Sequence, residues 1–196
     1  MEAIDRKKYM SKVEIKQLRQ NAEARAYIDL RKGRVQGPLS WMLVDLALST
    51  GLRVSEIEKL KTSDIDYKRC CLTIERNKKK HKRRETLAIG KDLLDHLKAF
   101  VADRTKGKLF VGKRGPLSAQ GLQQVWKASI KRAGLPKALS IHSARHTLAV
   151  HLLKKTNNLR QVQKQLGHSS PATTANMYAD ISFEDMSDGL NGLYED

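Results

Sequence analysis

The sequence predicts a mainly α-helical domain with one small antiparallel β-hairpin. Apolar residues recur at helical spacing through most of the chain, and capping residues or glycines separate these stretches. Two short strand-like runs flank a basic segment near the middle. The length of 196 residues is enough for one well-packed core, so we expect a single domain.

The composition points to a polyanionic partner. The chain has 38 Lys and Arg against 21 Asp and Glu, a formal net charge of +17. This excess favours nucleic acid, with an acidic membrane surface as the second candidate. The chain has no run of about 18 apolar residues and no signal-peptide core, so we expect a cytoplasmic, nucleoid-associated protein without membrane contact. Cys70 and Cys71 are adjacent and alone, which fits neither a zinc site nor a disulfide framework.

The N-terminal part predicts two helices, the second of them central. Residues 1–10 are charged and are expected to be flexible. Ser11 and Glu14 form a capping pair that starts the first helix. Apolar residues dominate residues 39–48 so strongly that this second helix should be buried on nearly all sides, and Gly51 ends it.

Arg53 follows that glycine at the start of a further helix, which carries Val54, Ile57 and Leu60. A cation at such a corner, beside a buried element, is well held, and Glu56 is close enough to orient it. An arginine in a turn is commonly only a solvated surface charge, so this position alone does not identify a site.

A strongly basic hairpin comes next. The strand-like runs lie at residues 72–74 and 86–89, and residues 76–84 between them include seven Lys or Arg among nine positions. Seven like charges repel one another in the free protein, which favours phosphate contacts over a merely solvated loop. The expected DNA-binding side chains are Arg76, Lys78, Lys79, Lys82, Arg83 and Arg84.

Two further helices should complete the core. Residues 93–101 place apolar side chains on one face. After a turn at residues 112–116, Ser118 caps a helix that Gly134 closes. Trp126 stands at helical spacing on that helix, so we expect it in the core rather than in a ligand site.

The stretch from Ser140 to Tyr178 concentrates side chains that suit a phosphodiester. His142 and Arg145 lie three positions apart at the start of a helix, where residues three or four apart share a face. We assign these two to a site, and His146 to packing or a supporting hydrogen bond.

The chain after this helix carries the remaining candidates. A second, short helix is stopped by Gly167, which places His168 just past its end, and Tyr178 falls near the end of the next helix. Residues 182–196 have the apolar spacing of an amphipathic helix, with five acidic residues and no basic ones from position 184 onward, so this helix should not contact DNA.

Taken together, these segments resemble the catalytic domain of the tyrosine recombinase, or phage integrase, family over roughly residues 11–181. Any one matching block is weak evidence, but four blocks in the same order are specific. They are Thr50 to Ile57, the basic hairpin, His142 to Thr147, and Leu166-Gly167-His168 leading to Thr173, Thr174 and Tyr178. The resemblance implies the catalytic-domain fold of that family.

The resemblance also implies roles for the matching residues. Arg53 and Arg145 match the two arginines that clamp the scissile phosphate. His142 and His168 match positions that hydrogen-bond its oxygens and help move the proton of the nucleophile, and Tyr178 matches that nucleophile.

A lysine of the hairpin matches the general acid for the leaving 5′-hydroxyl. Counting back from Ile89 along the second strand favours Lys80, but other lysines are near enough to serve: Lys78, Lys79 and Lys82.

The chemistry supports these roles independently. A tyrosine hydroxyl has a pKa near ~10 and needs cationic and hydrogen-bonding neighbours to be activated. Two guanidiniums can bind the non-bridging oxygens and stabilise the charge of the transition state. We therefore expect no metal, which fits the absence of a clustered set of carboxylates in the sequence. A phosphotyrosyl link conserves the energy of the broken bond, so resealing should need no nucleotide cofactor.

The chain departs from the family pattern twice. His168 and Tyr178 are ten positions apart, where nine is usual in the family. The sequence also begins at what resembles the first helix of the catalytic domain, so we expect no upstream core-binding domain. It is either a fragment or similar to short members such as the fimbrial DNA invertases.

The leading hypothesis is a site-specific recombinase, of integrase or invertase type, that acts on double-stranded DNA through a 3′-phosphotyrosyl intermediate. It would assemble as a tetramer on DNA through residues 182–196. An enzyme similar to type IB topoisomerases and a non-catalytic DNA-binding accessory protein are the alternatives.

Overall fold

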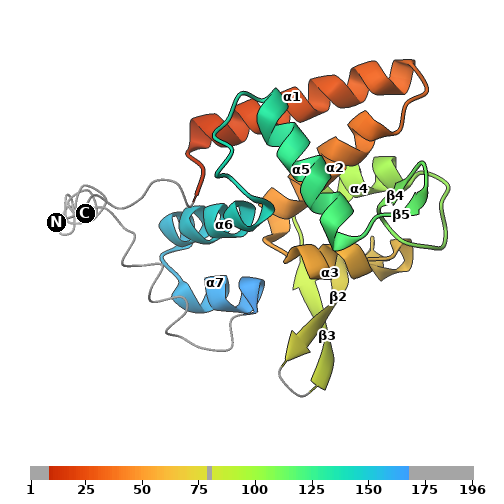
Figure 1. Cartoon of the computed structure of the whole chain (residues 1–196). Helices are drawn as coiled ribbons and strands as arrows, with labels where there is room; N and C mark the ends of the chain where they lie inside the picture. Colours follow the sequence, from red (N-terminus) through yellow and green to blue (C-terminus); the bar gives the residue numbers. More distant parts are fainter. Residues whose placement is uncertain (1–8, 79–80, 168–196) are drawn as a thin grey trace.

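The computed structural model describes residues 9–78 and 81–167 and confirms the mainly α-helical class (Figure 1). A short 3-10 turn spans Thr62–Asp64. The α-helices of the described part are α1 (Lys12–Arg31), α2 (Gln36–Thr50), α3 (Val54–Lys59), α4 (Lys91–Val101), α5 (Ala119–Arg132), α6 (Ile141–Thr156) and α7 (Leu159–Leu166). None of these helices has both the length and the apolar character needed to cross a membrane.

The predicted hairpin is present, but its strands are longer than expected. A three-stranded antiparallel sheet has the order β1 (Ile65–Asp66), β2 (Cys71–Lys78) and β3 (His81–Ala88). The register pairs Cys71 with Ala88 and Lys78 with His81, so most of the basic run lies in paired strands instead of a loop. A second small ribbon, β4 (Val111–Gly112) with β5 (Gly115–Pro116), stands where we predicted only a turn. Strands of two residues are too short to produce an alternating pattern in the sequence.

Helix α2 is the centre of the core, as its apolar composition predicted. It packs against α1, α4, α5 and α6, and nearly all of its side chains are buried. Its one buried carboxylate, Asp45, is satisfied by the guanidinium of Arg19 and by Nδ1 of His96, which lies 2.7 Å from Oδ2. Trp126 is fully buried in the same core and donates from Nε1 to the carbonyl of Leu139 at 2.9 Å, which confirms it as a core residue.

The segment before α1 is held against α6. Met10 is fully buried, its amide donates to Oγ1 of Thr147 at 2.9 Å, and its carbonyl lies 2.9 Å from Nε2 of His151. We expected residues 1–10 to be flexible, and the structure corrects this for Met10, whose apolar side chain gains more from burial than the charged residues before it. Residues 1–8 lie outside the described part of the chain.

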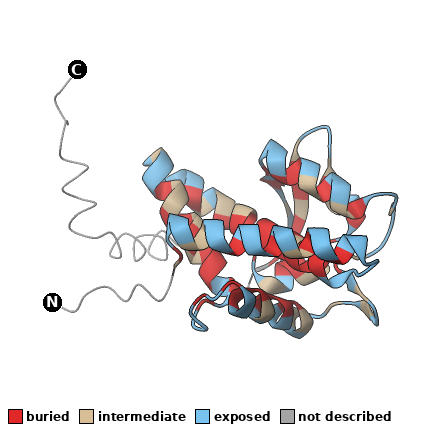
Figure 2. Cartoon of the chain, turned by 90° about the horizontal axis from the view of Figure 1, so that it is seen from above, coloured by how far each residue is buried: buried red, intermediate tan, exposed pale blue. Residues whose placement is uncertain are grey.

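Helices α6 and α7 meet the C-terminal end of α2 and thereby bring distant segments to one place. The two helices share a small apolar cluster that includes Val162 and Leu166. Gly51 ends α2 with φ +64°, and a Cβ there would lie 2.7 Å from Cδ2 of Leu166. Figure 2 shows buried residues on the inward faces of the helices and exposed residues on their outer faces. The ends of α2 and α7, the start of α3 and the first turns of α6 therefore surround one point.

Candidate functional site

Arg53 is fixed at the start of α3 by Glu56. The carboxylate of Glu56 accepts from the backbone amide of Arg53 at 2.8 Å and from its guanidinium NH1 at 3.0 Å. Glu56 itself is buried, whereas the side chain of Arg53 is 44% exposed. The arginine is thus oriented by a buried anion, as expected from the sequence, and remains accessible to a ligand.

Arg145 is the buried partner of this arginine. It stands on α6, is 3% exposed, and donates from NH1 to the carbonyl of Gly51 at 2.9 Å and from NH2 to the carbonyl of Leu166 at 2.7 Å. It therefore joins the ends of α2 and α7. Burial, together with the positive charges of Arg53 and Arg76, lowers the pKa of Arg145 to about 10, while Glu56 opposes this shift. The guanidinium still carries its charge at neutral pH.

His142 lies on the first turn of α6, near both arginines. Partial desolvation of the ring and the positive charges of Arg145 and Arg53 lower its pKa. The ring is therefore neutral at pH 7 and can accept a proton. The ring of His146 lies 5.0 Å away, edge to face, and is less exposed than that of His142. The division that we predicted, with His142 in the site and His146 in packing or a supporting hydrogen bond, stays a prediction.

Arg76 does not lie where the sequence led us to expect it. We predicted Arg76 as a DNA-binding residue at the basic tip of the hairpin, and contact with DNA stays a prediction; the residue is 2% exposed and donates from NH2 to the carbonyl of Gln165 at 2.8 Å. Its Nε is 3.4 Å from a carboxylate oxygen of Glu85. The burial of Arg76 has a physical cause: its guanidinium reaches the end of α7, whose last carbonyls lack helical partners and attract a cation.

A cavity of about 400 Å³ opens beside Arg53 and His142. Lys127 and Gln123 of α5 line it, together with Ser55 of α3. No pattern in the sequence predicts that Lys127 lines this cavity. It follows Trp126 on a helix whose apolar periodicity identifies core residues only. The cavity places a third basic residue close to Arg53 without adding a carboxylate.

The other expected site residues are only partly described. Arg83 and Arg84 are exposed on β3, with Arg84 NH2 3.2 Å from an Asp64 oxygen. Lys79, Lys80, His168, Tyr178 and the segment 182–196 lie outside the described residues, as do the side chains of Lys78 and Lys82. In residues 9–78 and 81–167, no cluster of three or more His, Cys, Asp or Glu side chains is arranged to hold a metal ion.

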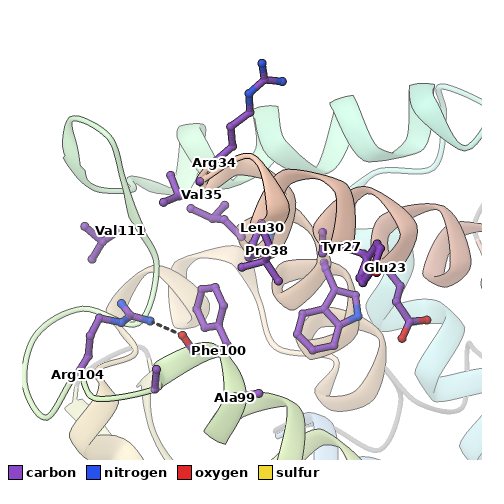
Figure 3. A pocket seen from close by; sticks show the side chains of 15 residues that line it. Glu23, Tyr27, Leu30, Arg34, Val35, Pro38, Ala99, Phe100, Arg104 and Val111 are labelled. Atoms are coloured by element: carbon purple, nitrogen blue, oxygen red, sulfur yellow. Dashed lines mark hydrogen bonds between the residues drawn. The ribbon is translucent and has the colours of Figure 1, made fainter.

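A larger apolar pocket, about 630 Å³, shares no residue with this site. It lies between the end of α1, the start of α2 and the end of α4. Figure 3 shows Tyr27, Leu30 and Phe100 around it. Arg34 and Arg104 also line it, and the guanidinium of Arg104 donates to the carbonyl of Phe100 at 3.3 Å. The lining of the pocket is therefore mainly apolar, with charged residues of both signs, since Glu23 also belongs to it.

The comparisons with known proteins agree with this architecture. The model described as "Phage integrase family" matches residues 8–185. Tyrosine recombinase XerD of Corynebacterium glutamicum is 34% identical over 160 residues, which cover 78% of this chain and 51% of that protein. Tyrosine recombinase XerC of Actinobacillus pleuropneumoniae is 33% identical over 150 residues, or 72% of this chain and 47% of that protein. The chain spans about half the length of the curated relatives it matches.

Solved structures share the fold. The crystal structure of XerA recombinase matches with a TM-score of 0.75 and 23% identity, over 96% of this chain and 66% of that chain. The post-cleavage complex of XerH site-specific recombinase with a palindromic difH substrate matches with a TM-score of 0.72 and 22% identity, over 98% of this chain and 54% of that chain. The fold of this chain therefore corresponds to the fold of a part of each of these two solved structures.

Proposed function

The chain belongs to the phage integrase family, and on this premise we propose that it is a site-specific recombinase that cleaves and rejoins double-stranded DNA. The observation that carries the proposal is the convergence of Arg53 and Arg145 from helices 92 positions apart onto one point, with Glu56 orienting the first. Two guanidiniums that the fold brings close in space repel each other, and a phosphodiester between them would offset that repulsion.

We assign the steps of cleavage to this chain's residues as follows. Arg53 and Arg145 bind the non-bridging oxygens of the scissile phosphate. The hydroxyl of Tyr178 attacks the phosphorus and passes its proton to a neutral histidine, His142 or His168. The bond from phosphorus to the 5′-oxygen breaks, and Lys80 or a neighbouring hairpin lysine protonates that oxygen. The product is a 3′-phosphotyrosyl ester, and attack by a 5′-hydroxyl reverses the sequence and reseals a strand without a cofactor.

The experiment that tests the function is trapping of this ester. The protein is incubated with a nicked duplex that carries its recombination site, so that the short downstream fragment with the free 5′-hydroxyl diffuses away after cleavage. We expect an adduct that survives denaturation and is removed by protease. If no cognate site yields an adduct, a non-catalytic DNA-binding protein of the same fold is the better description.

A plasmid assay separates the second candidate, an enzyme similar to type IB topoisomerases, which would form the same kind of adduct. Such an enzyme would relax any supercoiled plasmid at low salt and would not recombine a marked pair of sites. Recombination that needs two copies of one site, with relaxation confined to plasmids that carry it, supports the recombinase.

The hairpin should supply binding that is independent of DNA sequence. Arg83 and Arg84 project from β3 into solvent. We expect a variant in which Arg83 and Arg84 are changed to Gln to bind every duplex more weakly. The slope of log K against log salt should fall by about 0.9 for each phosphate that the variant no longer neutralises. Fluorescence anisotropy on cognate and unrelated duplexes between low and moderate salt measures both effects, and a change in preference between the two duplexes would contradict the prediction.

We further propose that copies bound to DNA associate through residues 182–196. The charged residues of this segment are all acidic and its apolar residues recur at helical spacing, and the pocket of Figure 3 has a mainly apolar lining with Arg104 at its edge. Truncation after residue 181 should leave binding of a single half-site unchanged and abolish complexes with four protein copies. Mass photometry of cognate DNA complexes checks this, and four-copy complexes of the truncated chain would rule it out.

A further inference from the structure

Arg76 has more hydrogen-bond donors than the protein uses. A guanidinium has five N–H groups. Arg76 directs NH2 to the carbonyl of Gln165, while Nε and NH1 are buried and have no hydrogen-bond partner among the described residues. Because a buried unpaired donor forfeits its hydration, a side chain that served structure alone would not be expected to keep these N–H groups here.

The end of α7 explains only part of this arrangement. A helix terminus leaves carbonyls unsatisfied and favours positive charge, so one arginine bond to Gln165 is accounted for. A neutral amide could provide the same bond with less desolvation. The carboxylate of Glu85, 3.4 Å from Nε, gives partial charge balance, but it also faces Arg83 at 3.9 Å.

Arg76 and Arg145 lie side by side. Their guanidiniums bind the carbonyls of two consecutive residues, Gln165 and Leu166. The residue that follows is Gly167, with φ +65°, and a Cβ built on it would coincide with the guanidinium of Arg76. Position 167 therefore requires a glycine for two reasons, its backbone conformation and the space that Arg76 occupies.

Arg53 completes the group. Its charge lowers the pKa of both Arg76 and Arg145, after the larger effect of burial in each case. Three guanidiniums, at the start of α3, on β2 and on α6, are thus close enough for their charges to interact, and Glu56 and Glu85 are the carboxylates that act on Arg76. Such a concentration of like charge, with free donors, is what an anion with several oxygen acceptors would satisfy.

We propose that Arg76 is a third phosphate-binding residue of the site, whose Nε and NH1 groups donate to the same phosphodiester that Arg53 and Arg145 bind. This inference rests on the proposed function and deepens it. The hairpin then contributes to the site through the buried part of β2, in addition to the exposed cations farther along its strands.

The test uses the full chain and dimethyl phosphate, a probe with the non-bridging oxygens of a phosphodiester and no base. NMR of the arginine Nε–H groups follows the titration, with assignments from single variants. We expect the Arg76 and Arg53 signals to shift with one shared dissociation constant. The signal of Arg83, which pairs with Arg76 across the strands and is 68% exposed, should not saturate with that constant. An Arg76 signal that stays unmoved while that of Arg53 shifts would overturn the proposal.

Matched variants give a second readout. Arg76→Met should weaken dimethyl phosphate binding at least about tenfold, since a charge-assisted hydrogen bond is removed, whereas Arg69→Met removes the same charge from an exposed position outside the site and should change it less than about twofold. Arg76→Met also removes the donor to the carbonyl of Gln165 and the ion-pair partner of Glu85, so binding is measured at a temperature at which both variants are folded by circular dichroism. Equal binding by the two variants, with a melting temperature lowered by about 5 °C or more in Arg76→Met, would assign Arg76 to structure alone.

The outcome is separable from that of the proposed function. If no covalent DNA adduct forms, the recombinase function is rejected. The NMR shift of Arg76 on addition of dimethyl phosphate does not depend on that result. Wild-type rates of adduct formation in Arg76→Met would overturn the role of Arg76 and leave the recombinase standing.

Discussion

Tyr178→Phe is expected to form no covalent adduct with DNA, a loss below the limit of detection. The phenol oxygen is the atom that bonds to phosphorus in the proposed reaction, and phenylalanine keeps the ring while removing that atom. Binding of the cognate duplex should change less than about twofold, since the affinity comes mainly from cationic contacts with phosphates. Denaturing gels of the nicked-duplex reaction measure the first quantity, and anisotropy measures the second.

Tyr194→Phe is the matched control for this variant. It removes the same hydroxyl from the segment 182–196, which we assign to contacts between copies, so its adduct should form at the wild-type rate on a single half-site. A Tyr178→Phe protein that still forms the adduct, with Tyr194→Phe inactive, would move the nucleophile to position 194. The ten-position step from His168 to Tyr178 makes this comparison informative.

Arg145→Ala is expected to slow adduct formation by at least about 10³-fold. Removing one preorganised donor to a developing oxyanion costs about 10²–10³ in rate, and here a buried positive charge is removed as well. The change also removes the donors to the carbonyls of Gly51 and Leu166. Stability should therefore fall by about 2 kcal/mol or more, in contrast to an exposed arginine. Single-turnover cleavage and urea denaturation, both at low temperature, measure the two effects.

Two controls separate the chemistry of Arg145 from its structural part. Arg145→Lys keeps the charge but cannot reach two carbonyls and a phosphate at once, so cleavage should stay well below wild type. Arg84→Ala removes an exposed charge and should leave stability within about 0.5 kcal/mol. Cleavage by Arg145→Ala at the wild-type rate would contradict the clamp that we propose.

The features that could be predicted from the sequence are those set by neighbouring residues. The apolar run of residues 39–48 predicted a buried α2, and α2 is the centre of the core. The spacing of Arg53 and Glu56 predicted their contact, because residues three apart at a helix start face each other. The match of several separate motifs to one family, in order, indicated the fold before any contact was known.

What only the tertiary structure decided is how distant segments meet. The sequence contains no sign that Arg76 turns inward, because its position in a basic run resembles that of the exposed residues around it. Burial there depends on α7, whose last turn lies against β2 and presents unpaired carbonyls.

The same holds for the partners of Arg145. Residues 51 and 166 are far from it in the chain, and the approach of the ends of α2 and α7 requires a glycine at position 51 and the apolar cluster of α6 and α7. Local periodicity determines which face of a helix is buried, but it carries no information on which carbonyl of another helix that face will meet. The sequence alone therefore determined the family and the identity of most candidate residues, and the packing of α2, α6, α7 and β2 determined that a third arginine lies among them.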